Sequence, residues 1–240
     1  MEKLGARPTI ANRLYRVVEL IHRHGSAKRA VSAYIAKLRR GEQNNPRPPE
    51  MAGELKQRFG KEFPADLRVK SSDLQLSLPY EPVREHIFCK ALQLVTVRHS
   101  DYVFVDIGAG KGFALLVAAE HPFKRVVGIE LSETLTRIAR ENIQTYGNER
   151  KCHDIQCICA DATNFTLPPE PIVLYLFNPF QGRVMDRMLE NIKASLRQHP
   201  RDLWIIYVNP WEDRKFRRSR ELQLIASDMH FALYRTIRNH

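Results

Sequence analysis

The stretch YVFVDIGAGKGF, residues 102–113, decides the fold of this chain. Its first six residues, 102–107, are mostly apolar and rich in β-branched and aromatic side chains, which predicts a buried strand. Gly108, Gly110 and Gly112 follow at alternate positions, and an apolar helical pattern comes next. A strand, a glycine-rich turn and a helix in this order bring the backbone close to a ligand at the carboxyl edge of a parallel sheet. The free N–H groups at the start of the helix favour a polar ligand.

The spacing of the glycines distinguishes between two kinds of ligand. A dinucleotide-binding turn reads G-x-G-x-x-G. This turn reads G-x-G-x-G and has Asp106 two residues before its first glycine. The spacing therefore argues against a dinucleotide-dependent oxidoreductase, while a glycine-rich turn that binds nothing remains an alternative.

The next predicted strand, residues 125–130 (RVVGIE), ends in Glu130, eighteen positions after Gly112. A carboxylate at the tip of the strand beside the glycine turn can accept hydrogen bonds from both hydroxyls of a ribose. The structural alternative is a surface glutamate at the start of the following helix, where an acidic residue is favoured.

Two further predicted strands also end in polar residues. Residues 155–160 lead into Asp161, and residues 172–177 (IVLYLF) lead into Asn178. The carboxyl ends of parallel strands meet at one edge of a sheet, so we expect these strand tips and the glycine turn to form one site.

An acidic residue before G-x-G-x-G, followed by acidic strand ends at these intervals, resembles the class I, Rossmann-like methyltransferases that depend on S-adenosylmethionine (SAM). The resemblance covers about residues 80–240. It implies an α/β fold, with a Rossmann-like doubly wound, mostly parallel seven-stranded sheet, and SAM as the cofactor. The residues that it implies for cofactor binding are Tyr80, Asp106, Gly108, Ala109, Gly110, Gly112, Glu130, Leu131, Asp161, Ala162 and Asn178.

The resemblance also implies a role for several of these residues. Asp106 would steady the glycine turn or reach the amino group of the cofactor, Glu130 would hold the ribose, and Asp161 would meet the adenine. Tyr80 would cover the methionine end, with simple packing as the alternative. The three glycines would let the backbone pass beneath the cofactor.

Asn178, Pro179 and Phe180 are the candidate catalytic residues. They stand where amino-group methyltransferases carry (Asn/Asp)-Pro-Pro-(Tyr/Phe), a motif that accepts hydrogen bonds from a target amine and stacks a ring on the target group. The second proline is absent here, which leaves methylation of nitrogen plausible and puts adenine specificity in doubt. A structural Asn-Pro turn is the alternative.

The chain is expected to divide at a Pro/Asn-rich linker into a basic helical extension, residues 1–50, and a methyltransferase domain, residues 51–240. Within the second part, helices are predicted over residues 83–97, 113–120, 132–146 and 183–196, and a strand over residues 203–208. Residues 222–226 and 231–237 are expected to form a terminal antiparallel pair. The segment after Asp161 is too short and proline-rich for a full helix, and the last crossover helix is expected to be short.

The net charge of +11 is unevenly distributed. Residues 1–60 hold 13 lysines and arginines against 5 acidic residues, residues 61–180 hold 13 against 15, and residues 181–240 hold 12 against 7. Basic ends suggest an anionic partner such as RNA, DNA or an acidic protein surface, with a solvated exterior as the alternative.

No apolar run is long enough to span a bilayer, no signal peptide is recognisable, and the four cysteines form neither a disulfide framework nor a metal motif. A cytoplasmic location is the default expectation. The resemblance implies an enzyme that methylates a nitrogen of a protein or nucleic acid. The alternative is a non-catalytic basic module that binds nucleic acid or a partner through a degenerate Rossmann-like fold. The acceptor and the oligomeric state are left open.

Overall fold

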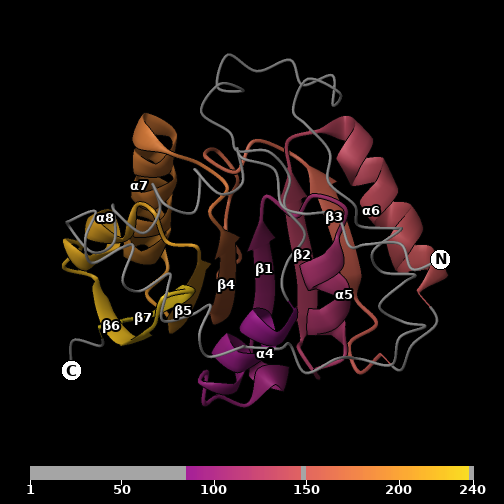
Figure 1. Cartoon of the computed structure of the whole chain (residues 1–240), viewed down its shortest axis with the longest axis horizontal. Helices are drawn as coiled ribbons and strands as arrows, with labels where there is room; N and C mark the ends of the chain where they lie inside the picture. Colours follow the sequence, from indigo (N-terminus) through magenta and orange to yellow (C-terminus); the bar gives the residue numbers. More distant parts are fainter. Residues whose placement is uncertain (1–84, 147–149, 238–240) are drawn as a thin grey trace, which may run out of the picture. The chain divides into compact units, whose positions relative to one another are not determined.

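The computed structural model describes residues 85–146 and 150–237 of the chain. The predicted strands form one seven-stranded sheet in the order β3-β2-β1-β4-β5-β7-β6 (Figure 1). The strands are β1 Val103–Ile107, β2 Arg125–Glu130, β3 Ile155–Cys159, β4 Ile172–Phe177, β5 Leu203–Val208, β6 Leu222–Ser227 and β7 Phe231–Thr236. Strands β1 to β5 pair in parallel, whereas β7 is antiparallel to both β5 and β6. The predicted mostly parallel, doubly wound sheet is confirmed.

Helices cover both faces of this sheet. They are α4 Glu85–Gln93, the 3-10 helix η3 His99–Asp101, α5 Phe113–Ala119, α6 Glu133–Thr145, α7 Gly182–Gln198 and α8 Asp213–Arg217. Side chains of α4, α5 and α6 pack in one hydrophobic cluster with alternate residues of the strands. Side chains of α7 and α8 pack with the other set in a second cluster. Since strand side chains alternate between faces, strands buried on both faces carry the continuous apolar runs seen in the sequence.

Most predicted elements begin and end within two residues of their observed bounds. The helix expected over residues 83–97 instead ends at Gln93. Beyond Gln93 the hydrogen bonds span three residues instead of four. The N–H of Leu94 donates to the carbonyl of Ala91, and that of Val95 donates to the carbonyl of Leu92. The residues that follow, Val95-Thr96-Val97, are β-branched and disfavour helix. As expected, no helix forms between Asp161 and β4, and α8 is short.

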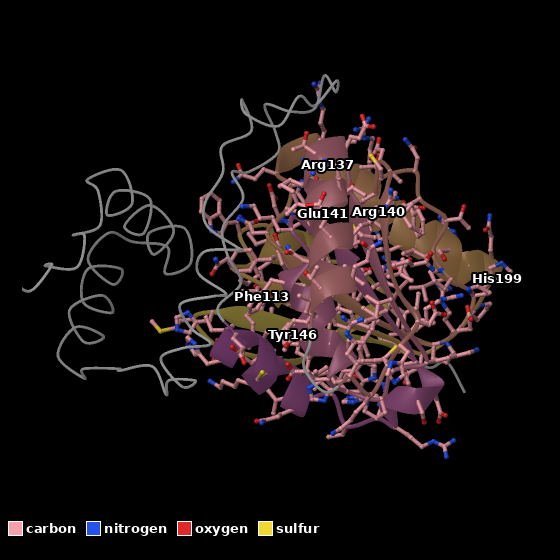
Figure 2. The ribbon with its side chains drawn as sticks, turned by 90° about the vertical axis from the view of Figure 1, so that its right-hand side faces the viewer. Phe113, Arg137, Arg140, Glu141, Tyr146 and His199 are labelled. Carbon is pink, nitrogen blue, oxygen red and sulfur yellow. The ribbon has the colours of Figure 1, made fainter. Side chains whose placement is uncertain are left out.

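Hydrogen bonds join helix α6 to the end of α5 and to β3. Figure 2 shows Arg137, Arg140 and Glu141 along one half of this helix and Tyr146 at its far end. The Tyr146 hydroxyl donates to Glu120 Oε1 at 2.6 Å, at the end of α5. Arg140 Nε donates to the carbonyl of Cys157 on β3 at 2.9 Å. The first bond fixes the end of α6 to α5, and the second fixes its middle to β3.

Other expectations concern parts of the chain outside the described residues. Tyr80, the helical extension and the domain boundary at residue 50 all lie there. Within residues 85–146 and 150–237, no helix is both long enough and apolar enough to cross a membrane. The four cysteines are free thiols, with Cys152 and Cys157 buried and Cys159 exposed.

A buried carboxylate joins three strands at the edge of the sheet opposite the glycine turn. Asp202, just before β5, accepts hydrogen bonds from the Tyr102 hydroxyl at 2.5 Å and from Arg235 Nε and Nη2 at 2.8 and 2.9 Å. The Arg235 guanidinium also lies over the Trp204 ring, 4.8 Å from its centroid. These contacts join the starts of β1 and β5 to the end of β7.

We expect Asp202→Asn to lower the free energy of unfolding by about 2 kcal/mol, because an amide cannot accept all three bonds or balance the Arg235 charge. The value is below that of a fully buried pair because Arg235 is about one-third exposed. Urea unfolding measures the change. The control is Asp101→Asn, which breaks an exposed pair with Arg98 and should change stability by less than about 0.5 kcal/mol. Equal effects of the two substitutions would contradict this role.

Candidate functional site

The glycine turn occupies the carboxyl end of β1. Gly108, Gly110 and Gly112 have φ angles of 76°, 56° and 85°, in the left-handed region that favours glycine. The N–H groups of Gly108 and Ala109 both donate to the carbonyl of Ile129, at 2.9 and 3.1 Å. The turn is thereby fixed against the end of β2.

Two of these glycines also lie against neighbouring elements. A Cβ added at Gly108 would lie 3.0 Å from Cβ of Pro179, so the glycine turn meets the tip of β4. A Cβ at Gly112 would lie 3.2 Å from Cβ of Ala139 on α6. The structure thus brings the first glycine and the Asn-Pro-Phe segment together, as the sequence predicted for one sheet edge.

Glu130, at the tip of β2, holds the middle of the turn. Its Oε2 accepts the N–H of Gly110 at 2.8 Å, and its Oε1 accepts the N–H of Ser132 at 2.8 Å. The side chain is only 8% exposed, and burial raises its pKa although the backbone N–H donors act in the opposite direction. A carboxylate has about four acceptor positions, and the backbone N–H groups of Gly110, Ser132 and Leu131 act on this one, so a position for a further donor remains.

Asp106 is a second buried carboxyl group on the same face of the sheet. It is 3% exposed, and burial, with the nearby charge of Glu130, raises its pKa well above that of an exposed aspartate. Tyr175 is its register partner on β4. The Tyr175 hydroxyl is buried and has no hydrogen-bond partner within the described residues. This part of the site therefore holds acidic and hydroxyl groups with little solvent around them.

At the tip of β3, Asp161 organises its own turn. Its Oδ1 accepts both the N–H and the hydroxyl of Thr163 at 2.8 Å, and its Oδ2 accepts from Asn164 Nδ2 at 3.1 Å. Ala162 is buried in the core, and Leu131, after β2, is half-buried. The N–H of Ala160 donates to the carbonyl of Glu130, which joins this tip to β2. Contact of Asp161 with an adenine stays a prediction.

Asn178, at the tip of β4, is buried with an unpaired donor. It is 3% exposed and has a φ of 41°, a left-handed conformation that asparagine tolerates better than most residues. Its Oδ1 accepts the hydroxyl of Tyr207 at 3.2 Å, while its Nδ2 has no hydrogen-bond partner in the part of the chain that the structure describes. Phe180 is partly buried against the α7 side of the core.

Sequence reasoning missed Tyr207, which fixes the Asn178 carboxamide. Tyr207 lies inside the apolar run of β5, LWIIYV, where a tyrosine predicts only packing. One signal was available, because β5 ends in Asn209-Pro210-Trp211 just as β4 ends in Asn178-Pro179-Phe180. Asn209 also has a left-handed φ, 47°. Two neighbouring strands thus end in the same kind of turn.

The sequence of the described domain matches a known family. Residues 104–199 match the family model described as a methyltransferase domain, and this range includes the glycine turn and the tips of β2, β3 and β4. This part of the chain is a class I SAM-dependent methyltransferase domain. SAM is accordingly the cofactor of this methyltransferase.

Solved structures with a similar fold include other methyltransferases. The 23S rRNA methyltransferase ErmE is 16% identical, with a TM-score of 0.46 over 66% of this chain and 69% of that chain. A ribosomal protein L11 methylase from Lactobacillus delbrueckii subsp. bulgaricus is 15% identical, with a TM-score of 0.45 over 64% of this chain and 78% of that chain. An RNA methyltransferase from Salinibacter ruber, in complex with S-adenosyl-L-homocysteine, is 19% identical, with a TM-score of 0.41 over 65% and 92%. Similarity at this level identifies no substrate.

The groups at this edge of the sheet suit SAM. The cofactor carries an ammonium group and a ribose diol, both hydrogen-bond donors, and Asp106 and Glu130 are acceptors that burial keeps from solvent. Gly108 has no side chain, and a side chain there would press on Pro179. When bound, SAM supplies a methyl group activated on a sulfonium. The methyltransferase itself has to bind SAM and the methyl acceptor, orient them toward each other and exclude water from the site.

The Asp106 carboxyl group should lower the free energy of unfolding. Its raised pKa means that the folded chain retains a proton that the unfolded chain loses above about pH 4, so stability falls as the pH rises. We expect Asp106→Asn to increase the free energy of unfolding by at least about 1 kcal/mol at pH 8 and by less at pH 5. Urea unfolding at the two pH values measures this.

The same substitution should weaken SAM binding, which isothermal titration calorimetry measures. The Asp106 carboxyl group can lose its proton and pair with the ammonium group of SAM, whereas an amide cannot carry that charge. A variant that is less stable than the wild type at pH 8, or that binds SAM equally well, would contradict this account of Asp106.

Proposed function

We propose that this methyltransferase transfers a methyl group from SAM to a nitrogen atom of a macromolecular substrate, a nucleic acid or a protein. The observation that carries the proposal is the Asn178 carboxamide, which is buried at the tip of β4 with its Nδ2 unpaired among the described residues. Leaving a buried donor unpaired costs about 1–3 kcal/mol. A bound ligand that accepts a hydrogen bond from Nδ2 would remove this cost, which accounts for an unpaired donor beside the glycine turn.

On the acceptor side, the carboxamide provides both kinds of hydrogen-bonding group. Oδ1 accepts one bond from Tyr207 and has a second lone pair, which can accept an N–H of the target nitrogen. Nδ2 can donate to an acceptor beside that nitrogen. Amides and nucleobase edges place a nitrogen beside such an acceptor. The carbonyl of Pro179 would supply a second acceptor, and the half-buried ring of Phe180 would border the target group.

On the cofactor side, we assign the residues as the family resemblance implies. Glu130 would accept the ribose hydroxyls while it continues to hold Gly110, and Asp106 would face the amino group of the methionine part. Ala109 and Leu131 would line the ligand together with the turn, and Asp161 with Ala162 would border the adenine. Catalysis then consists largely of alignment. The nitrogen lone pair forms a bond to the methyl carbon as the bond from that carbon to the sulfonium breaks, which leaves S-adenosyl-L-homocysteine. A target nitrogen that carries a proton releases it to water.

The Asn178 assignment can be tested against a matched control on the neighbouring strand. Asn178→Ala and Asn209→Ala each remove an asparagine in a left-handed conformation before a proline, so they carry a similar backbone cost. We expect Asn178→Ala to lower the rate of methyl transfer about 100-fold, because the target nitrogen loses its alignment. Asn209→Ala should stay within about threefold of the wild type, since its side chain has no assigned role.

The measurement is transfer of radiolabelled methyl from SAM to total RNA, DNA fragments and a protein extract, followed by nuclease or protease digestion and chromatography of the labelled products. Calorimetry with SAM separates the two roles that the resemblance implies for Asn178. Equal affinities of the two variants assign the lost activity to the acceptor side, whereas weaker binding by Asn178→Ala assigns it to the cofactor side. Equal activity of the two variants would remove Asn178 from the acceptor site, and label on oxygen or carbon would contradict nitrogen as the target. A wild-type protein that binds SAM and labels none of the fractions would favour a non-catalytic module.

A further inference from the structure

Three exposed arginines lie beside the proposed acceptor site. Arg214 lies on α8, Arg218 caps its end, and Arg183 is the second residue of α7. We call these three residues the α8 basic surface. They lie in the last sixty residues of the chain, which hold 12 lysines and arginines against 7 acidic residues.

Two hydrogen bonds through the Tyr207 hydroxyl connect the start of α8 to Asn178. The N–H of Glu212, which precedes α8, donates to the Tyr207 hydroxyl at 3.2 Å, and the same hydroxyl donates to Asn178 Oδ1. Glu212 Oε1 also accepts the N–H of Gly182 at 2.8 Å, and Lys215 Nζ donates to the Gly182 carbonyl at 2.7 Å. One tyrosine hydroxyl therefore separates the start of α8 from the acceptor asparagine, and Arg183 directly follows Gly182.

The arginines on α8 point away from the core. Phe216 is fully buried and packs on the sheet, so it defines the inner face of the helix. With about 3.6 residues per turn, Arg214 and Arg218 share one face of the helix, opposite Phe216. Figure 1 shows α8 next to α7, at the end of the sheet where β6 and β7 lie.

Other side chains already neutralise the acidic residues around these arginines. Lys215 Nζ lies 2.6 Å from Asp186 Oδ1 and 3.4 Å from Glu212 Oε2, and Arg217 Nε lies 2.5 Å from Asp213 Oδ2. Within the described residues, no ion pair is formed by the three arginines of the α8 basic surface. Their positive charge is therefore open to a partner.

The arginines of α6 are different. Arg137 lies 2.6 Å from Glu141, and Arg140 donates to the carbonyl of Cys157 (Figure 2). A surface whose basic groups are paired in this way offers less to an anionic partner. The α8 basic surface differs from α6 because its three arginines form no ion pair within the described residues.

We propose that the α8 basic surface binds the phosphodiester backbone of a polynucleotide that presents its nitrogen to Asn178. This inference rests on the proposed function of Asn178. Guanidinium groups form paired hydrogen bonds with phosphate oxygens and keep their charge at every physiological pH. Three of them next to one acceptor site suit a chain with one negative charge per nucleotide. Trp211, half-buried in the turn before α8, adds an aromatic group on which bases can stack.

The test compares two triple variants of the full chain. The first changes Arg183, Arg214 and Arg218 to glutamine. The second changes Arg98, Lys124 and Lys151 to glutamine, three exposed residues before β1, β2 and β3 at the opposite edge of the sheet. Both variants lose three positive charges, and both keep the basic N-terminal region. They differ in the position of the lost charge and in its pairing, because Arg98 lies 2.8 Å from Asp101 and Lys124 lies 3.4 Å from Glu170.

Fluorescence anisotropy measures binding to a labelled single-stranded RNA of about 20 nucleotides, to DNA of the same sequence and to poly-glutamate, between 50 and 300 mM salt. We expect the α8 variant to bind the polynucleotide at least about tenfold more weakly than the control variant at about 100 mM salt. We also expect its logarithmic salt slope to be smaller by about 2, since each phosphate contact contributes about 0.7 to 0.9. Comparison of RNA with DNA identifies the natural polymer.

Equal loss of affinity in the two variants would overturn the proposal, because binding would then follow net charge. Poly-glutamate binding with the same dependence on the three arginines would also overturn it, in favour of an acidic protein. Calorimetry with SAM should be unchanged in both variants. If the polynucleotide binds through these arginines but receives no methyl group, the proposed function fails while the binding surface stands, so the two failures are distinguishable.

Discussion

The site depends on one buried carboxylate, that of Glu130, and on the two N–H groups that it accepts. Gly110 belongs to the turn after β1, whereas Ser132 is the residue whose side chain caps α6 by accepting the N–H of Leu135. A single side chain therefore fixes the glycine turn, the tip of β2 and the start of α6 in one arrangement. The backbone bonds from Gly108 and Ala109 to Ile129 reinforce it. A cofactor that reaches this edge meets a turn that is already ordered.

The chemistry of the site works against the stability of the fold. Asp106, Glu130 and Asn178 are all more than nine-tenths buried, and each has a capacity for hydrogen bonds beyond those it makes in the described structure. Such groups lower stability unless a ligand pairs with them. The surrounding apolar strands and the Asp202 contacts at the opposite edge compensate for this cost. Polar groups with unmet bonding capacity are thereby concentrated at the carboxyl ends of β1, β2 and β4.

Much of this arrangement could be predicted from the sequence, because local patterns encode it. β2, β4 and β5 have the predicted bounds, since continuous apolar runs mark strands buried on both faces. The glycine spacing and Glu130 predicted that the turn lies beside the tip of β2, but not that Glu130 accepts the N–H of Gly110. The role of Tyr207 could not be predicted, because Asn178 is brought to it only by the pairing of β4 with β5. The basic excess of residues 181–240 was visible in the sequence, but which of its side chains are paired depends on contacts made in the fold, such as that of Lys215 with Asp186 on α7.

The most direct test of the account is calorimetric titration of the full chain with SAM, with S-adenosyl-L-homocysteine and with NAD. Glu130→Ala is compared with Glu133→Ala, an exposed glutamate three residues later. The account predicts binding of the first two ligands in the micromolar range, no binding of NAD, loss of binding in Glu130→Ala and full affinity in Glu133→Ala. Equal affinities of the two variants for SAM, or tighter binding of NAD than of SAM, would contradict the central claim that the Glu130-held turn is the cofactor site.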